Sequence, residues 1–454
     1  MPISISIIIP AHNAALHLVR CLTAICESSR VPHEIIVVDD ASKDSTAVVA
    51  TRLGATVLST GTNRGPAFAR NLGAKTATGD ILFFLDSDVC VQSNTLEKIL
   101  SSFHADSTLD ALMGSYDSNP SSPDFISQYR NLMHCYVHQS GEENASTFWS
   151  GCGAIRRTLF LEHSGFHEGY GRPAIEDIEL GYRLIRAGRK IILDRSIQVT
   201  HMKRWTFWGL VKTDIFDRGI PWTELILRDR CLPDDLNLQL SQRVSVALVF
   251  LLVGLCGVMT LMRGSYALIS LFVIVFLMLA RWWGEMGNYE RPRTAFAILT
   301  STLAIVGVAA YWQKMFVLIP FLMVTPVLLF MRHRYNRLGS VRQWHRRIGI
   351  LFICTAVVAA GTYLPTHHLI VPCFAILVLL GLLNSQFYIF LASHRGLAFM
   401  LAAIPFHLLY HFYSGISFIA GVGRYLLFED KIRKPVEMPT VLSTFASPGS
   451  ETQV

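Results

Sequence analysis

The distribution of apolar residues divides the chain in two. Up to about Leu240 the sequence mixes charges of both signs with apolar residues, whereas long apolar runs dominate from Val244 onward. A helix that crosses a bilayer needs about 20 mainly apolar residues, and several of these runs reach about that length. They raise the mean hydropathy of the 454-residue chain to +0.39. We therefore expect a globular N-terminal domain and an α-helical transmembrane C-terminal domain.

Six apolar runs are predicted to span the membrane. They begin at Val244, Ser265, Thr294, Met315, Ile348 and Leu369. Segment 397–428 is also apolar, but Pro405 and several glycines leave open whether it forms a seventh span or a broken, re-entrant helix. We assign 244–428 to the membrane domain and expect the tail at 429–454, rich in Pro, Ser and Thr, to be disordered.

The loop at 332–347, between the fourth and fifth runs, indicates the orientation. It contains six arginines and no acid, and such loops stay cytoplasmic. Counting back four spans gives the N-terminal domain the same side. The N-terminus lacks the basic region and cleavage site of a secretory signal, and the nine cysteines form no C-x-x-C pair. These features predict an integral protein of the inner or plasma membrane with a cytoplasmic N-terminal domain.

Strand and helix patterns alternate in the N-terminal half. Strands are predicted at 3–9, where Pro10 ends the run, and at 35–38, 56–58 and 81–85. After the first strand comes a helical pattern with four apolar positions, Leu16, Val19, Leu22 and Ile25. This alternation predicts a Rossmann-like, mainly parallel sheet with helices on both faces. Ligands of such sheets bind beyond the carboxyl ends of the strands.

Acidic residues follow two of these strands. They are Asp39, Asp40, Asp86 and Asp88. Carboxylates that converge on one edge repel each other unless cations or hydrogen-bond donors join them. A D-x-D pair at a strand end suits a hard divalent cation that bridges phosphate oxygens, although the same residues also shape turns or cap helices. No G-x-G-x-x-G or Walker loop is present, so dinucleotide or P-loop binding is not indicated.

The motifs from Ile3 to about Arg228 resemble, in order, those of inverting nucleotide-sugar glycosyltransferases of family 2, which have the GT-A fold. SIIIPAHN is similar to the first-strand motif, with His12 where tyrosine is common. VVDDASKDST, NRGPAFARNLG and LDSD resemble the second strand, the segment beside the nucleotide and the metal-binding D-x-D. The resemblance implies a nucleotide-sugar site, with Asp40 at the nucleobase. Its residues would be Pro10, Asn13, Asp39, Asp40, Asn63, Gly65, Arg70, Asn71 and Asp86.

The resemblance also implies Mg²⁺ or Mn²⁺ held by Asp86 and Asp88, with His201 as a third ligand. His201 opens HMKRW, which is close to the Q-x-x-R-W motif of processive members that make cellulose or hyaluronan. Histidine in place of glutamine argues against processive synthesis. The alternative is a histidine at a strand end that binds no ligand.

FWSGCGAIRRTLF and IEDIELGYRLIRAG resemble the acceptor-side elements of the family, in which the aspartate after the glutamate is the catalytic base. That residue is Asp177 here. The other acceptor-side residues implied are Gly151, Cys152, Gly153, Glu176, Arg204 and Trp205. Acids at a helix N-terminus are also favoured by the helix dipole, and both interpretations can hold together.

Segment 205–243 interleaves Trp and Phe with Lys and Arg, as interfacial helices do. We therefore expect a GT-A domain at 1–204 followed by an amphipathic linker on the bilayer. The expected reaction is sugar transfer from a UDP-linked nucleotide-diphospho-sugar to a membrane-associated acceptor, which is a lipid or a glycan. No nucleic acid partner is expected. The alternatives are a processive polysaccharide synthase and an inactive scaffold or transport component. A transporter is disfavoured because the spans carry almost no charge at mid-depth.

Overall fold

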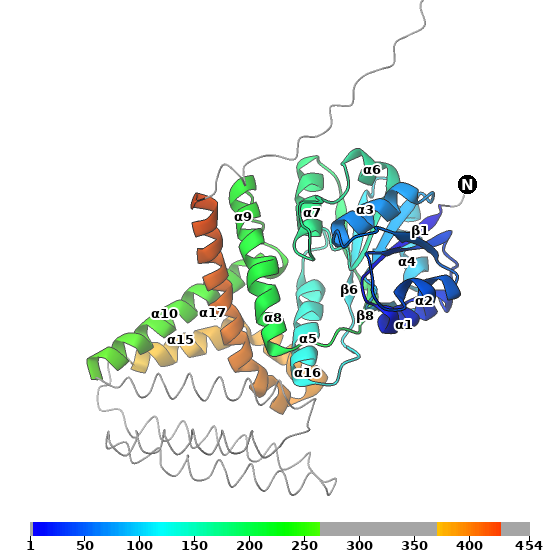
Figure 1. Cartoon of the computed structure of the whole chain (residues 1–454). Coiled ribbons are helices and arrows are strands. Elements are labelled where there is room, and N and C mark those ends of the chain that lie inside the picture. The colour runs from blue at the N-terminus through cyan, green and yellow to red at the C-terminus, as the bar shows by residue number, and fades with distance from the viewer. Residues whose placement is uncertain (1–2, 264–369, 428–454) are drawn as a thin grey trace, which may run out of the picture.

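The computed structural model describes residues 3–263 and 370–427. A domain built on one β-sheet lies beside a group of long helices (Figure 1). The predicted apolar runs that begin at Ser265, Thr294, Met315 and Ile348 lie outside the described residues, as do the arginine-rich loop and the tail.

The sheet contains eight strands in the order β3-β2-β1-β4-β7-β6-β8-β5. Their bounds are β1 Ile5–Ala11, β2 Glu34–Asp39, β3 Thr56–Ser59, β4 Ile81–Leu85, β5 Val89–Val91, β6 Ala111–Tyr116, β7 Cys152–Arg156 and β8 Ile191–His201. Strands β3, β2, β1 and β4 are parallel, as are β6 and β8, whereas β7 is antiparallel to both of its neighbours and β5 is antiparallel to β8. The predicted mainly parallel, Rossmann-like sheet is confirmed.

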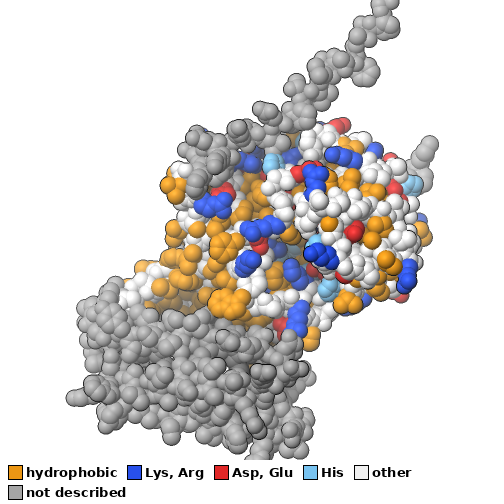
Figure 2. Space-filling model, in the orientation of Figure 1, with side chains coloured by type: hydrophobic (Ala, Val, Ile, Leu, Met, Phe, Trp, Pro, Cys, Tyr) orange, Lys and Arg blue, Asp and Glu red, His pale blue; other side chains and the backbone are white. Residues whose placement is uncertain are grey.

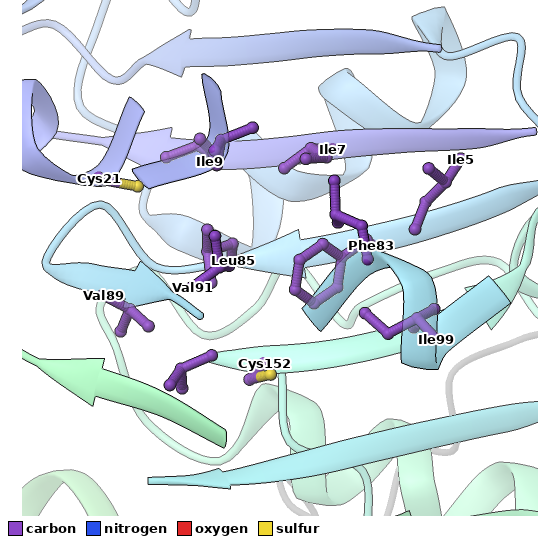
Figure 3. Packing of buried hydrophobic residues seen from close by; sticks show 14 of the residues in the cluster. Ile5, Ile7, Ile9, Cys21, Phe83, Leu85, Val89, Val91, Ile99 and Cys152 are labelled. Atoms are coloured by element: carbon purple, nitrogen blue, oxygen red, sulfur yellow. The ribbon is translucent and has the colours of Figure 1, made fainter. Parts of the chain in front are cut away.

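Helices cover both faces of this sheet, because successive side chains of a strand point to opposite sides. The helices are α1 Ala15–Cys26, α2 Thr46–Arg52, α3 Pro66–Thr76, α4 Thr95–Ala105, α5 Phe125–Ser140, α6 Arg157–Glu162 and α7 Glu176–Arg186. Ile7 and Phe83 point into the core under α1 and α4 (Figure 3), and Ile8 and Phe84 into the core under α3, α6 and α7. Strands β1 and β4 are therefore buried on both faces, and their carboxyl ends are held firmly.

Pro10 does not end the first strand, as predicted from the sequence, but lies within β1. In β1, Ile5 and Ala11 accept hydrogen bonds on the β2 side, so the even-numbered residues face β4. The pairing of β1 with β4 ends at Ile8. A backbone N–H at position 10 would face the β4 side, where β1 is no longer paired. Proline at this position therefore costs no hydrogen bond between the two strands.

The helical pattern predicted after the first strand is confirmed as α1, but two of its four apolar positions lie outside the buried face. Leu16 and Val19 are 87% and 43% exposed, while Leu18, Cys21 and their neighbours Leu22 and Ile25 are buried. A repeat of three residues drifts around a helix of 3.6 residues per turn. Leu16 therefore lies on the side opposite Ile25.

Helices, several of them long, make up the described C-terminal part of the chain. They are α8 Phe207–Lys212, the π-helix η1 Thr213–Gly219, α9 Ile220–Asp229, the 3₁₀ turn η2 Leu236–Leu238, α10 Leu240–Arg263, α15 Ile370–Leu383, α16 Ser385–Arg395 and α17 Leu397–Leu427. By length and composition, Leu240–Gly257 and α17 are candidate membrane spans. The run from Leu369 forms two helices bent by 64° rather than one straight span, and α17 continues through Pro405 without a break.

The helices α8, η1 and α9 follow one another and pack lengthwise along α17 (Figure 1). The approach is close at Gly219, where an added Cβ would lie 2.4 Å from Ser417 Oγ. Helix α16 is fastened to the sheet domain by Arg395, whose Nε donates to Gln128 Oε1 on α5 at 2.7 Å. Hydrophobic side chains gather over these helices, and Lys and Arg side chains lie between them and the sheet domain (Figure 2).

Candidate active site

Arg70 joins two carboxylates at the carboxyl edge of the sheet. Its Nη2 donates to Asp86 Oδ1 at 2.7 Å and its Nη1 to Glu176 Oε1 at 2.9 Å. Arg70 and Glu176 are buried. Burial raises the pKa of Asp86, with Arg70 opposing the shift and Asp88 adding to it. Arg70 therefore ties the end of β4 to the start of α7, and without it two carboxylates would face each other uncompensated.

Asp177 lies in the first turn of α7, one residue after Glu176. Its Oδ2 accepts hydrogen bonds from Ser150 N and Ser150 Oγ, both at 3.0 Å, and its Oδ1 accepts one from Ile178 N at 2.9 Å. A carboxylate oxygen has two acceptor positions, so Oδ1 keeps a lone pair for a proton while both positions of Oδ2 are taken. Ser150 and the backbone at the start of α7 hold Asp177 in one orientation.

His201 lies beside Asp88 because Val89, which follows Asp88, pairs with His201 across β5 and β8. His201 Nε2 is 3.6 Å from Asp88 Oδ2. The other ring nitrogen, Nδ1, donates to Asn131 Oδ1 at 2.6 Å, since an amide oxygen can only accept. In the neutral ring this bond leaves the lone pair on Nε2, on the Asp88 side, as in histidines that bind metals.

The donor set of Asp86, Asp88 and His201 fits a divalent cation in chemistry. Burial alone would raise the pKa of Asp88, but interactions with His201, Lys203 and His17 lower it to about 2, so the carboxylate is ionised at neutral pH. Among residues 3–263 and 370–427, however, no three His, Cys, Asp or Glu side chains already stand close enough to hold an ion. The metal site therefore remains a prediction.

Asp40 shapes the loop before α3. Its Oδ1 accepts from Arg64 N at 2.9 Å and its Oδ2 from Gly65 N at 2.8 Å. Gly65 has a φ of +86°, and a Cβ there would lie 2.7 Å from the backbone of Gly171, so only glycine fits. The neighbouring Asp39 accepts from Ser42 N at 3.2 Å. A nucleobase contact of Asp40 remains a prediction.

His12, where the family commonly has tyrosine, connects several predicted nucleotide-binding residues. Its Nδ1 donates to the carbonyl oxygen of Asp40 at 2.7 Å, and its Nε2 lies 2.9 Å from Asn13 Nδ2. Asn63 Nδ2 is 3.2 Å from His12 Nδ1. The ends of β1 and β2 and the loop before α3 therefore meet at this imidazole.

Asn71, one residue after Arg70, does not bond to the carboxylates that Arg70 joins but to the backbone of Phe166. Its Oδ1 accepts from Phe166 N at 2.9 Å and its Nδ2 donates to Phe166 O at 2.8 Å. This pair of bonds fixes the turn after α6. The amide is buried and engaged with that turn, and a direct contact with a nucleotide sugar is untested.

Two glycines around β7 allow Trp149 to approach. A Cβ on Gly151 would lie 2.7 Å from the Trp149 ring, and one on Gly153 2.4 Å from Trp149 O. Between them, Cys152 is buried and pairs with Leu85 of β4. The predicted acceptor-side glycines thus bring Trp149, and Ser150 after it, up to Asp177.

Arg204 and Trp205 lie at the junction with the long helices. Trp205 is buried and packs in one apolar cluster with residues of α5, α16 and α17, and its backbone N–H donates to Ser127 Oγ at 2.7 Å. Arg204 is half exposed, with its Nε 3.8 Å from Asp124 Oδ2. Their acceptor-side role is untested.

Several residues that lie around His201 and Asp177 were not predicted from the sequence. They are Tyr116, Asn131, His134, Trp149, Ser150 and Arg218. Trp149 and Ser150 lie inside FWSGCG, so the motif itself was a usable signal. Asn131 and His134 lie on α5, where an amphipathic pattern gives no sign that they face a site.

Comparison with known proteins identifies the class. Residues 6–163 match the family model described as glycosyl transferase family 2. The matched residues make up most of the sheet domain, which has the Rossmann-like GT-A fold, and the match supports a glycosyltransferase.

Individual relatives match in part. An uncharacterized glycosyltransferase of Haemophilus influenzae is 37% identical over 97 residues, 21% of this chain and 33% of that protein, so the chain spans about a third of its length. The O-antigen chain rhamnosyltransferase RfbN of Salmonella typhimurium is 28% identical over 237 residues, 48% of this chain and 74% of that protein.

A solved structure with similarity across most of the chain is the mannosyltransferase PcManGT of Pyrobaculum calidifontis in complex with GDP-Man and Mn²⁺. It has a TM-score of 0.42 and 15% identity, and the match covers 93% of this chain and 86% of that one. A likeness at this TM-score adds nothing to the assignment of fold or function.

Proposed function

We propose that this protein is an inverting glycosyltransferase that moves a sugar from a nucleotide-diphospho-sugar, UDP-linked, to a lipid acceptor at the cytoplasmic face of a membrane. The observation that carries the proposal is the meeting of Arg70, Asp86, Glu176 and Asp177 at the carboxyl edge of the sheet. The family 2 match over residues 6–163 supports the reaction class.

Asp177 is the proposed base. Its carboxylate would take the proton of the acceptor hydroxyl while that oxygen attacks the anomeric carbon and the bond to the nucleotide diphosphate breaks on the opposite side. One carbon–oxygen bond forms, one breaks, and the proton resides on Asp177. Ser150 would keep the carboxylate aimed during the attack.

Asp86, Asp88 and His201 are the residues that would hold Mg²⁺ or Mn²⁺, which supplies positive charge to a departing diphosphate. Arg70 engages only one oxygen of Asp86, so Oδ2 of that side chain is left for an ion. Asn131 would present the lone pair of His201 Nε2 on the Asp88 side.

The membrane part of the proposal is supported by the candidate spans in α10 and α17 and by an exposed row on α8 and η1. Trp208 and Phe216 are 63% and 52% exposed, and Lys212 lies between them at helical spacing. An aromatic row with a lysine is typical of a helix at the bilayer surface. A lipid acceptor would reach the site from this side.

Nucleotide binding tests the enzyme class. Full-length protein in phosphatidylcholine nanodiscs is titrated with UDP by calorimetry, with Mn²⁺ or with EDTA. We expect binding that requires the metal and that Asp88→Asn weakens by about tenfold or more, since one charged ligand to the ion is lost. Asp106→Asn, at an exposed carboxylate paired with Lys190, serves as the matched control and should bind as the wild type does.

If no nucleoside diphosphate or nucleotide sugar binds in the presence of Mn²⁺, the enzyme proposal is wrong. A ladder of long polymer among the products would instead favour the processive synthase over single-sugar transfer.

A further inference from the structure

Two arginines share one buried carboxylate where η1 packs between α5 and α17. Asp214 of η1 accepts from Arg130 Nη2 of α5 at 2.6 Å and, through its other oxygen, from the Tyr413 hydroxyl of α17 at 2.7 Å. Asp214 and Arg130 are buried. Both oxygens of Asp214 are therefore already bound to strong donors.

Arg218, one turn further along η1, is left with weak partners. Its Nη1 is 3.9 Å from Asp214 Oδ1 and donates to His134 Nε2 at 3.2 Å. Burial, helped by the charges of Arg130 and Arg218, lowers the pKa of His134 well below its usual value, so this ring is a neutral acceptor. Among the described residues no other hydrogen bond of the Arg218 guanidinium is found, and its side chain remains 36% exposed.

Arg130 and Arg218 have a single carboxylate, Asp214, within ion-pair distance among the described residues. A guanidinium does not lose its proton in proteins, so two positive charges face one negative charge there. The nearby Asp217 is paired with Arg172 at 3.0 Å, and the Asp177 carboxylate attracts Arg218 electrostatically without forming an ion pair with it. Partly desolvated positive charge with free donors in a fork geometry is suited to a phosphate or carboxylate.

Arg218 lies between the proposed base and the candidate membrane helix. On one side His134 stacks with Tyr116 at a ring distance of 5.9 Å, and Tyr116 meets Trp149, which precedes Ser150 and so leads to Asp177. On the other side η1 contacts α17 through Asp214 and Tyr413. The face between the sheet domain and the apolar helices carries Lys and Arg side chains (Figure 2).

We propose that Arg218 binds the phosphate of an anionic lipid acceptor and thereby positions the accepting oxygen of that acceptor at Asp177. This inference rests on the proposed function and adds the chemical class of the acceptor. The unused donors of the Arg218 guanidinium suit an anion, and the contact of η1 with α17 favours an anion that arrives with an apolar chain. Arg70, in contrast, lies on the donor side with Asp86.

The test uses full-length protein in phosphatidylcholine nanodiscs and three probes, namely farnesyl phosphate, farnesol and inorganic phosphate, titrated by native mass spectrometry. We expect farnesyl phosphate to bind at least about tenfold more tightly than farnesol, since a charge-assisted fork is lost with the phosphate. Arg218→Gln should remove this preference, while Arg218→Lys should retain part of it because the charge remains. Arg189→Gln, at an arginine between α7 and β8 whose Nη1 lies 4.0 Å from Asp110 Oδ1, is the matched control.

Binding of UDP with Mn²⁺ is measured on the same samples. Equal affinity for farnesyl phosphate and farnesol in the wild type would overturn the inference. Retention of the preference by folded Arg218→Gln would also overturn it. So would competition by inorganic phosphate equal to that by farnesyl phosphate, since the bound anion would then be a soluble one. A parallel loss of UDP binding in the variant would likewise overturn it, since the bound anion would then be the donor diphosphate. Should Arg218→Gln fail to fold, Arg218→Lys decides: if it prefers farnesyl phosphate over farnesol as strongly as the wild type does, the inference is wrong. Failure of every form to bind UDP would instead contradict the proposed function alone.

Discussion

At the scale of single residues, the site is organised by donors that orient carboxylates. Arg70 holds Asp86 and Glu176, Ser150 holds Asp177, and Asn131 orients His201. The protein thus supplies each acid with a specific partner, and each acid can keep a different task.

Replacing Asp177 with asparagine removes the only proposed proton acceptor while keeping an oxygen for the hydrogen bonds of Ser150. We expect transfer to fall by about 10²–10⁴, the usual contribution of a general base. Binding of UDP with Mn²⁺ should be unchanged, because Asp177 is not among the proposed metal ligands. Transfer is measured with labelled nucleotide sugar and membrane lipids, with Asp106→Asn as the control. Full transfer by Asp177→Asn would remove the residue from the base role.

At the scale of elements, α7 is positioned by its contact with the segment before β7. A Cβ on Gly181 would lie 2.3 Å from Phe148 N and 2.6 Å from the backbone of Thr147. These are backbone atoms that cannot rotate away, so the helix that carries Asp177 depends on glycine at this one position.

Gly181→Ala should therefore push α7 away from the segment that carries Ser150. Alanine gains about 1 kcal/mol of helix propensity over glycine, but overpacking against backbone costs about 1–3 kcal/mol. We expect a lower melting temperature and transfer reduced several-fold. The matched control is Gly423→Ala in α17, where nothing lies within 4 Å of an added Cβ and the melting temperature should be equal or higher. A variant as stable and active as the wild type would show that α7 tolerates the shift.

At the scale of the whole molecule, polar contacts join the sheet domain to the long helices at several points. Arg395 links α16 to α5, and Asp214 links η1 to Arg130 of α5 and Tyr413 of α17. The last of these joins residues 199 positions apart in the chain. Ion pairs such as Arg186–Asp229 also join the two parts. The buried network around Asp214 is therefore one of several contacts that hold their relative orientation.

Tyr413→Phe deletes one donor to the buried Asp214 and nothing else. Hydrogen bonds to charged groups contribute about 1.5–3 kcal/mol, so we expect a lower free energy of unfolding and a lower melting temperature in nanodiscs. Tyr425→Phe, on the same helix, should leave both unchanged. Differential scanning fluorimetry measures the effect, and equal stability of the two variants would mean that the Tyr413 hydroxyl does not support the junction.

The sequence by itself determined the alternation of strands and helices, because apolar periodicity and strand-end acids are local signals. β4 was predicted at 81–85, and structure gives Ile81–Leu85. The strand boundary at Pro10 was wrong, since the range over which strands pair depends on neighbours in space. Which apolar positions of α1 are buried likewise follows from the packing of the helix on the sheet.

Only the tertiary structure decided how the acids are used. The motifs assign Asp40 to the nucleobase and Asp86 and Asp88 to a metal, and the structure adds that Asp40 holds a loop, Asp86 is paired with Arg70, and Asp88 faces His201. The structure also shows that Asp214 binds both Arg130 and Tyr413 while Arg218 keeps unused donors, which no local pattern indicates. The physical reason is that these contacts join residues from different elements, 16 positions apart for Arg70 and Asp86 and 199 apart for Asp214 and Tyr413, and their geometry exists only once the sheet and helices have packed.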